Sequence, residues 1–345
     1  MTDVQTLGPG PVDTARRHAA RRALTVGIVL SAVAAALAVA ALSIGDYPLT
    51  LGQIWEVLIG GGDRAQRYVV LQVRLPRLAM ALLAGAALGV AGALLQSLLR
   101  NPLASPDLLG ISGGSTLAAV FGLLVLGISG PPLAGVAFAG GLLAALLLLA
   151  AARGQAAGFR LILAGIGVSF LSASVVGYLL TRAQLQQAQA ALVWITGSLS
   201  TTPWWQVLVL ALTWVLALPA LAILARQLPI AVLGSATATG LGVRPGGIRV
   251  AVVLVAVLLT AVTCAFTGPI SFVALCAPAI ARPLVAHGSI ALSSSAIVGA
   301  TLLVASDLIA QFAIPGVAVP VGVVTGALGA IFLLWLLATS KGRAL

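Results

Sequence analysis

Long uninterrupted apolar runs constrain the fold of this chain more than any other feature. Each run is close to the roughly 20 residues that a helix needs to cross a bilayer, and polar or turn-forming residues separate consecutive runs. The runs cover residues 24–44, 78–99, 108–128, 133–152, 161–180, 208–224, 248–266, 270–285, 290–313 and 318–338. We therefore predict an all-α, polytopic membrane protein with about ten transmembrane helices in one domain.

The scarcity of charge excludes a large soluble protein. Charged residues make up 7% of the chain and hydrophobic residues 61%, whereas soluble domains carry about 25% charged residues. A membrane β-barrel is not expected either, because its strands alternate polar and apolar positions over about 10 residues. Cys264 and Cys276 lie in or beside apolar runs without metal-site spacing, so we expect neither a disulfide nor a metal site.

Basic residues lie at the ends of the apolar runs, and their distribution predicts the orientation. Cytoplasmic loops are enriched in arginine and lysine, and the segment before the first run carries Arg16, Arg17, Arg21 and Arg22. We predict a bacterial cell-membrane protein with both termini in the cytoplasm: a tail at 1–22, a transmembrane domain at 23–340 and a tail at 341–345. This orientation accounts for the net charge of +11, so nucleic acid is not expected as a partner.

Three polar segments between the runs are long enough to be noted. Residues 45–73 form an external segment, in which we expect a short surface helix at 54–59. Residues 182–203 are rich in glutamine and are predicted to be a polar external stretch. Residues 226–247 are predicted to be a long cytoplasmic loop.

The stretch from Arg74 to Gly114 has the pattern of a hairpin of two membrane helices. It opens with RLPR, continues as a glycine-rich apolar run, and turns at the polar segment 101–107. Gly85 and Gly89 are four residues apart and therefore share one helix face, so we expect a neighbouring helix to approach closely there.

This stretch resembles the FecCD family of ABC importer permeases. The resemblance rests on RLPR, GAALGVAGALLQ and RNPLASPDLLGISGG in this order, and it continues in GPISFVALCAPAIARPLVAHG and VASDLIAQ, covering roughly residues 45–340. It implies a BtuC-like type II importer permease that receives substrate from an external binding protein. It also implies a second permease subunit, identical or related, two ATP-binding subunits and no cofactor. The implied substrate is a ferric siderophore, with haem or cobalamin as alternatives.

The chain itself lacks the residues for ATP chemistry. A Walker A loop needs a lysine followed by serine or threonine, and the only lysine, Lys341, precedes Gly342. We therefore expect a translocating subunit and not an enzyme. The resemblance makes 226–247 the segment that couples to the ATPase, through short helices. Its matching residues are Leu233, Gly234, Ser235, Ala238, Leu241 and Gly242, with Ser235 in place of the family's acidic residue.

The resemblance also implies roles for other positions. The arginines of the family's RLPR motif receive acidic residues of the binding protein, which implies docking at Arg74 and Arg77 beside Gln311. The other implied positions are Asn101, Pro102, Pro106 and Gly110 in the motif loop, Ser169, Ser172, Ser174 and Thr325 along the translocation pathway, and Pro278 and Arg282 at the cytoplasmic end, where Ala279 replaces a histidine. The alternatives are that the arginines reach lipid headgroups and that the hydroxyls bond to carbonyls of their own helices.

Two other classes of function remain open from the residues alone. Asp307 lies inside an apolar run, and an intramembrane carboxylate is a functional hypothesis by default, here an ion-coupled carrier. A structural polar contact is the competing interpretation. Ser112 lies in a G-x-S-x-G pattern, which in a hydrolase requires a base within reach of the serine. Close packing of small residues explains that pattern better.

Overall fold

The computed structural model describes residues 11–151, 157–285, 290–314 and 319–340, and within these ranges the chain forms helices and no strands. The ends of the two predicted tails, residues 1–10 and 341–345, and with them Lys341, lie outside the described residues.

The helices confirm the predicted number and order of apolar segments. Among the described residues, seven helices are long and apolar enough to cross a membrane, and three shorter apolar helices occupy the remaining predicted runs. The long ones are α1 (Pro11–Ser43), α4 (Leu75–Leu99), α6 (Pro131–Ala151), α7 (Ala157–Arg182), α9 (Trp204–Val232), α11 (Pro245–Thr267) and α13 (Leu292–Phe312). The shorter ones are α5 (Ile111–Leu124), α12 (Val273–Val285) and α14 (Val321–Ser340).

Short helices occupy the polar segments. After α1 come α2 (Leu51–Leu58), α3 (Arg64–Tyr68) and the π-helical turn η1 (Val69–Arg74), which leads into α4. Thr50 and Asp63 cap α2 and α3 through reciprocal capping boxes, which satisfy backbone N–H groups that a helix start leaves unpaired. The expected surface helix near residue 54 is therefore present. Residues 182–203, predicted to be a polar external stretch, contain α8 (Leu185–Thr196).

The predicted loop at 226–247 is mostly helical. Helix α9 continues to Val232 with Pro219 and Pro229 inside it, although an internal proline removes a backbone hydrogen bond and usually ends or kinks a helix. After two residues the six-residue helix α10 (Ser235–Gly240) begins, and α11 starts at Pro245. The segment is therefore a compact helical corner with one short helix between two long ones, whereas the resemblance implied two short coupling helices.

Helix α4 forms the centre of the core and packs against α13, α11, α12 and α9. The carbonyl groups of Gly299 and Ser295 on α13 occupy the space where a Cβ at Gly85 or Gly89 would lie. The two helix backbones are thus nearly in contact, which confirms the predicted close approach at these two glycines. Small residues permit this geometry because dispersion contacts then form along both backbones.

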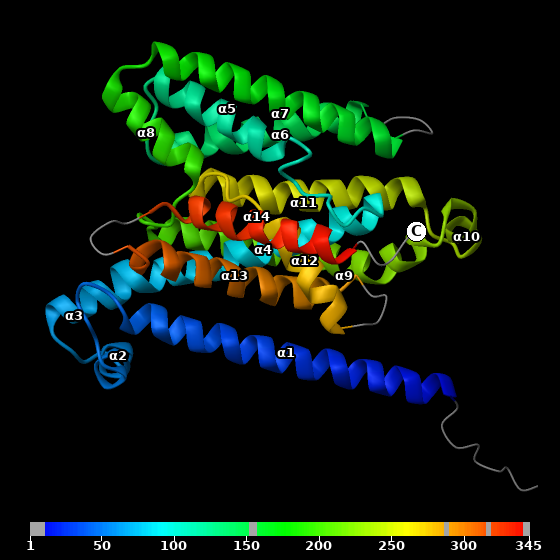
Figure 1. Ribbon diagram of the computed structural model, residues 1–345, viewed down its shortest axis with the longest axis horizontal. Coiled ribbons are helices and arrows are strands. Elements are labelled where there is room, and N and C mark those ends of the chain that lie inside the picture. The colour runs from blue at the N-terminus through cyan, green and yellow to red at the C-terminus, as the bar shows by residue number, and fades with distance from the viewer. Residues whose placement is uncertain (1–10, 152–156, 286–289, 315–318, 341–345) are drawn as a thin grey trace, which may run out of the picture.

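The remaining helices surround this core in layers. Helices α5, α6 and α7 group together on the side of α11, while α1 packs on α13 at the opposite side (Figure 1). Helices α2 and α3 lie at one end of the long axis, and α10 lies at the other. The segments that carry the predicted docking and coupling residues are therefore at opposite ends of the molecule.

Candidate functional site

At the end that carries α2 and α3, a three-residue polar cluster joins α4 to α13. Arg77 donates two parallel hydrogen bonds to Asp307, from Nε to Oδ2 at 2.9 Å and from Nη2 to Oδ1 at 2.8 Å. Gln311, one turn further along α13, donates from Nε2 to Oδ2 at 2.8 Å. The Asp307 side chain is 7% exposed and that of Arg77 20%. The carboxylate is thus paired on both oxygens, which favours the structural interpretation of Asp307 over an ion-coupling role.

Arg74 has different hydrogen-bond partners from Arg77, although it lies only three residues before it. Its Nη1 donates to the Leu42 carbonyl oxygen at 2.6 Å, and its Nη2 donates to the Tyr47 carbonyl oxygen at 2.6 Å. These carbonyls belong to the end of α1 and the loop that follows it. Arg74 therefore ties α1 to the start of α4, whereas Arg77 ties α4 to α13. Sequence spacing placed both residues at one end of a helix but could not identify these separate partners.

The loop between α4 and α5 carries the motif positions and stays irregular for eleven residues, 100–110. The Asn101 side chain accepts a hydrogen bond from the Leu103 N–H at 2.9 Å, Pro106 is buried and Pro102 is exposed. Gly110 adopts a φ of 74°, and a Cβ there would lie 2.9 Å from the Gly165 carbonyl oxygen of α7. Because glycine alone combines this backbone with such an approach, α5 starts at residue 111 and not at the predicted residue 108.

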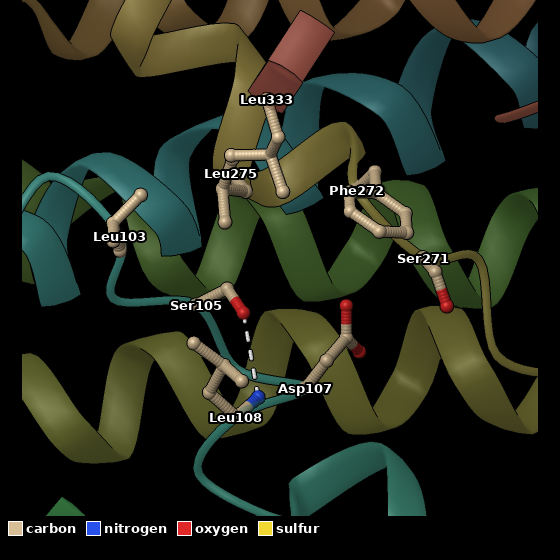
Figure 2. Close-up of a pocket in the computed structure, with 8 residues that line it drawn as sticks. All are labelled: Leu103, Ser105, Asp107, Leu108, Ser271, Phe272, Leu275 and Leu333. Carbon is tan, nitrogen blue, oxygen red and sulfur yellow. Dashed lines mark hydrogen bonds between the residues drawn. The ribbon is translucent and has the colours of Figure 1, made fainter. Parts of the chain in front are cut away.

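The same loop forms one wall of a cavity of about 370 Å³. Three segments line it: the loop, the start of α12 with the two residues before it, and α14. The lining residues are Leu103, Ser105, Asp107, Leu108, Ser271, Phe272, Leu275 and Leu333. Figure 2 shows the Asp107 carboxylate pointing away from its own loop, toward Phe272 and Ser271 on the opposite wall. The cavity is thus apolar except for one carboxylate and a few hydroxyls.

Asp107 was not singled out from the sequence. Its carboxylate accepts hydrogen bonds from the Ser112 hydroxyl and from the Phe272 N–H. Burial raises the pKa of the Asp107 carboxyl group above its ordinary value, and these two hydrogen bonds oppose that shift. The Ser112 hydroxyl bonds directly to this carboxylate without an imidazole between them, so the geometry is that of a local cap and not of a nucleophile with its base.

The predicted pathway residues lie on two different helices. Ser174 on α7 and Thr325 on α14 donate to carbonyl groups of their own helices, Phe170 and Gly322. Ser172 is buried where α7 faces Gly113 of α5. Within the described residues these hydroxyls do not bond to one another. Within one subunit the three serines therefore share α7, whereas Thr325 lies on a separate helix, α14.

The outer faces of α7, α8 and α14 are apolar and exposed. Phe170 and Leu171 on α7 and Leu185 on α8 are among the most exposed large side chains of the molecule, together with Leu334 and Trp335 on α14. Lipid or another membrane protein has to cover such faces, because contiguous exposed apolar surface is rare in a protein surrounded by water.

At the opposite end of the molecule, α10 presents a small-residue surface between two leucines. Leu233 and Leu241 flank α10 and are 65% and 60% exposed, whereas Ala238 faces inward and is fully buried. Gly234 and Gly242 have φ values of 118° and 79°, and these left-handed turns set α10 across the ends of its neighbours. Ser235 begins the helix. The predicted coupling residues thus lie together at one corner of the molecule, which is mostly exposed although Ala238 is buried.

Pro278 and Arg282 anchor α12 against α4 near the same end. Pro278 is buried inside α12. Arg282 Nη2 donates to the Ser97 hydroxyl at 3.0 Å and to the Ala93 carbonyl oxygen at 3.2 Å. Gln96 adds a buried hydrogen bond from Nε2 to the Leu275 carbonyl oxygen at 3.1 Å. Sequence reasoning did not identify Gln96 or Ser97, whose only signal was a polar side chain at the end of an apolar run.

The described residues contain no group of histidine, cysteine or carboxylate side chains that could hold a metal ion. Cys264 and Cys276 are both buried free thiols, as expected.

Comparison with known proteins gives consistent matches over nearly the whole chain. The model of the FecCD transport family matches residues 27–339. The ferric enterobactin transport system permease protein FepG of Escherichia coli is 40% identical over 93% of this chain and 97% of its own length. The Fe(3+) dicitrate transport system permease protein FecD of Escherichia coli is 38% identical over 91% and 98%, and the hemin transport system permease protein HmuU of Yersinia pestis is 32% identical over 87% and 91%.

Solved structures agree with the sequence relatives. A metal-chelate type ABC transporter in an inward-facing conformation matches with a TM-score of 0.82 and 28% identity, over 91% of this chain and 99% of the other.

Proposed function

The chain belongs to the FecCD transport family, and from this premise we propose that it is the translocating subunit through which a ferric siderophore enters the bacterial cytoplasm. The observation that carries the proposal is the full-length similarity to permeases named for ferric enterobactin and ferric dicitrate. Haem is the second candidate substrate, because a hemin permease matches nearly as much of the chain.

The proposed pathway lies between two permease subunits, identical or related. A metal chelate needs a wider passage than the packed core of one subunit offers. The exposed apolar faces of α7 and α14 supply a surface for a second subunit, and pairing there would bring Ser169, Ser172, Ser174 and Thr325 toward a shared passage. The cavity beside Asp107 borders α14 and would then open on the same passage.

Two ATP-binding subunits would drive transport from the end that carries α10, so this chain itself would not be an enzyme. The exposed Leu233 and Leu241 on either side of α10 supply apolar anchors for such a contact. This assignment places both termini in the cytoplasm, in agreement with the arginine cluster before the first run.

The external binding protein would dock at the end that carries α2 and α3. Arg77 supports this role because its side chain remains 20% exposed although Asp307 binds one edge of its guanidinium group. Arg74 and Gln311 would border the docking surface and hold it in shape.

The test is uptake into proteoliposomes that contain this subunit, its partner permease, the ATP-binding subunits and the binding protein. We expect ATP-dependent uptake of a labelled ferric siderophore that vanadate blocks, with weaker uptake of haem and cobalamin. Preferred uptake of haem would move the assignment to the second candidate. Uptake that follows an ion gradient and ignores vanadate would overturn the assignment to an ABC importer.

A further inference from the structure

A polar pocket of about 210 Å³ opens beside α10, at the end of the molecule opposite to Arg77. The end of α4, the last turns of α9 and the start of α11 form its walls. Its polar lining comes from Arg100, Arg249 and Ser235, while Leu98, Val232 and Ile248 supply apolar surface. The volume exceeds that of several water molecules at about 30 Å³ each, so a side chain from another protein fits inside it.

Arg100 is held at the mouth of this pocket by an unusual backbone conformation. It is the residue at which α4 ends, with a φ of 50°, a left-handed position where glycine or asparagine is the ordinary occupant. Its Nη2 donates to the carbonyl oxygen of Val232 at the end of α9. One of five guanidinium N–H donors is thus used to fix the group in place, and the others remain available for a ligand.

The pocket carries positive charge that the described residues do not neutralise. No carboxylate lines it, and the ion pair between Arg77 and Asp307 lies at the other end of the molecule. Arg100 and Arg249 are both exposed. Two guanidinium groups that share one concave surface with a hydroxyl form a fork-shaped set of donors, which matches a carboxylate in geometry and charge.

We propose that this pocket receives an acidic side chain of the ATP-binding subunit, with Arg100 and Arg249 as its cationic partners and the Ser235 hydroxyl as a further donor. The inference rests on the proposed function, which makes this end of the chain cytoplasmic. A protein partner fits better than a lipid headgroup, because the adjoining α10 has the sequence SATATG and offers little apolar surface for insertion into a bilayer. The exposed Leu233 and Leu241, which flank α10, would supply apolar contacts to the same partner beside this charged contact.

The test compares two arginine variants in the full-length subunit, reconstituted in nanodiscs of phosphatidylcholine. Arg249→Gln removes a pocket charge, and Arg21→Gln removes an exposed charge on α1 that neither lines the pocket nor lies in the coupling segment. At low salt we expect Arg249→Gln to weaken binding of the purified ATP-binding subunit about tenfold, as for the loss of a charge-assisted hydrogen bond. Arg21→Gln should stay within about twofold of the wild type. Raised salt should reduce the difference between the two variants.

Further measurements separate the outcomes. Arg249→Lys keeps the charge but loses the fork and should fall between Arg249→Gln and the wild type. Equal binding by Arg249→Gln and Arg21→Gln would overturn the pocket assignment while leaving the proposed function intact. No binding of the ATP-binding subunit to the wild type would count against the proposed function itself. A loss in Arg249→Gln that occurs only when phosphatidylglycerol is present would assign the pocket to lipid and refute the protein contact.

Discussion

The ion pair between Arg77 and Asp307 allows a quantitative test of how α4 is held against α13. Asp307 is nearly buried and receives hydrogen bonds from Arg77 and Gln311. Removing one member of a buried pair leaves an uncompensated charge and costs about 3–5 kcal/mol, whereas replacing both members with apolar residues is often neutral or stabilising. Because 20% of the Arg77 side chain is exposed, we expect Asp307→Leu to cost about 3 kcal/mol.

The assay is the thermal unfolding midpoint of the purified subunit in detergent. A loss of about 3 kcal/mol corresponds to a midpoint lowered by roughly 4 °C in a chain of this size. The double variant Arg77→Met/Asp307→Leu should recover to within about 1 kcal/mol of the wild type, since no unpaired charge remains. The control is Glu56→Gln, which removes an exposed carboxylate from α2 and should leave the midpoint unchanged.

The comparison of single and double variants distinguishes an unpaired charge from lost packing as the cause of the instability. If the double variant is as unstable as Asp307→Leu, the instability arises from lost packing and not from an unpaired charge, and the reasoning is refuted. A stable double variant is also useful for testing docking. It should keep the fold and lose affinity for the binding protein, because the charge of Arg77 is gone.

Three further predictions follow from the same structure. Arg77→Glu should weaken binding of the external binding protein in nanodiscs at low salt, and raised salt should weaken the wild type; unchanged affinity of the variant would refute docking at this end. Gly240→Arg has open space around its Cβ, so the subunit should stay in the membrane while ATP hydrolysis no longer drives uptake; unchanged uptake would refute coupling through α10. Gly89→Leu should abolish folded protein in detergent because the Ser295 carbonyl occupies its side-chain space, whereas Gly135→Leu, which meets no neighbour, should yield wild-type amounts.

Local sequence was enough to determine the number, order and approximate limits of the membrane helices. Apolar runs of membrane length can satisfy their backbone polar groups in lipid only as helices. Their length and composition therefore predict these helices, whichever other segments they pack against. The same holds for the close contact at Gly85 and Gly89, since residues four apart share a face wherever the helix packs. The family pattern supplied the expectations for the docking, motif-loop and coupling segments, because short stretches of contiguous residues carry it.

The tertiary structure decided which partners the polar side chains have. Arg77 and Asp307 are 230 positions apart in the chain, and no periodicity could show that α4 and α13 place them within hydrogen-bonding distance. Arg74 binds carbonyl groups of another helix for the same reason. Packing also outweighs two local preferences. Helix α9 continues past Pro229, although a proline favours a helix end, and α5 begins only at residue 111, although apolar residues precede it. Sequence determines segments through local geometry and solvation, whereas partners, cavities and unpaired charges exist only once distant segments have packed together.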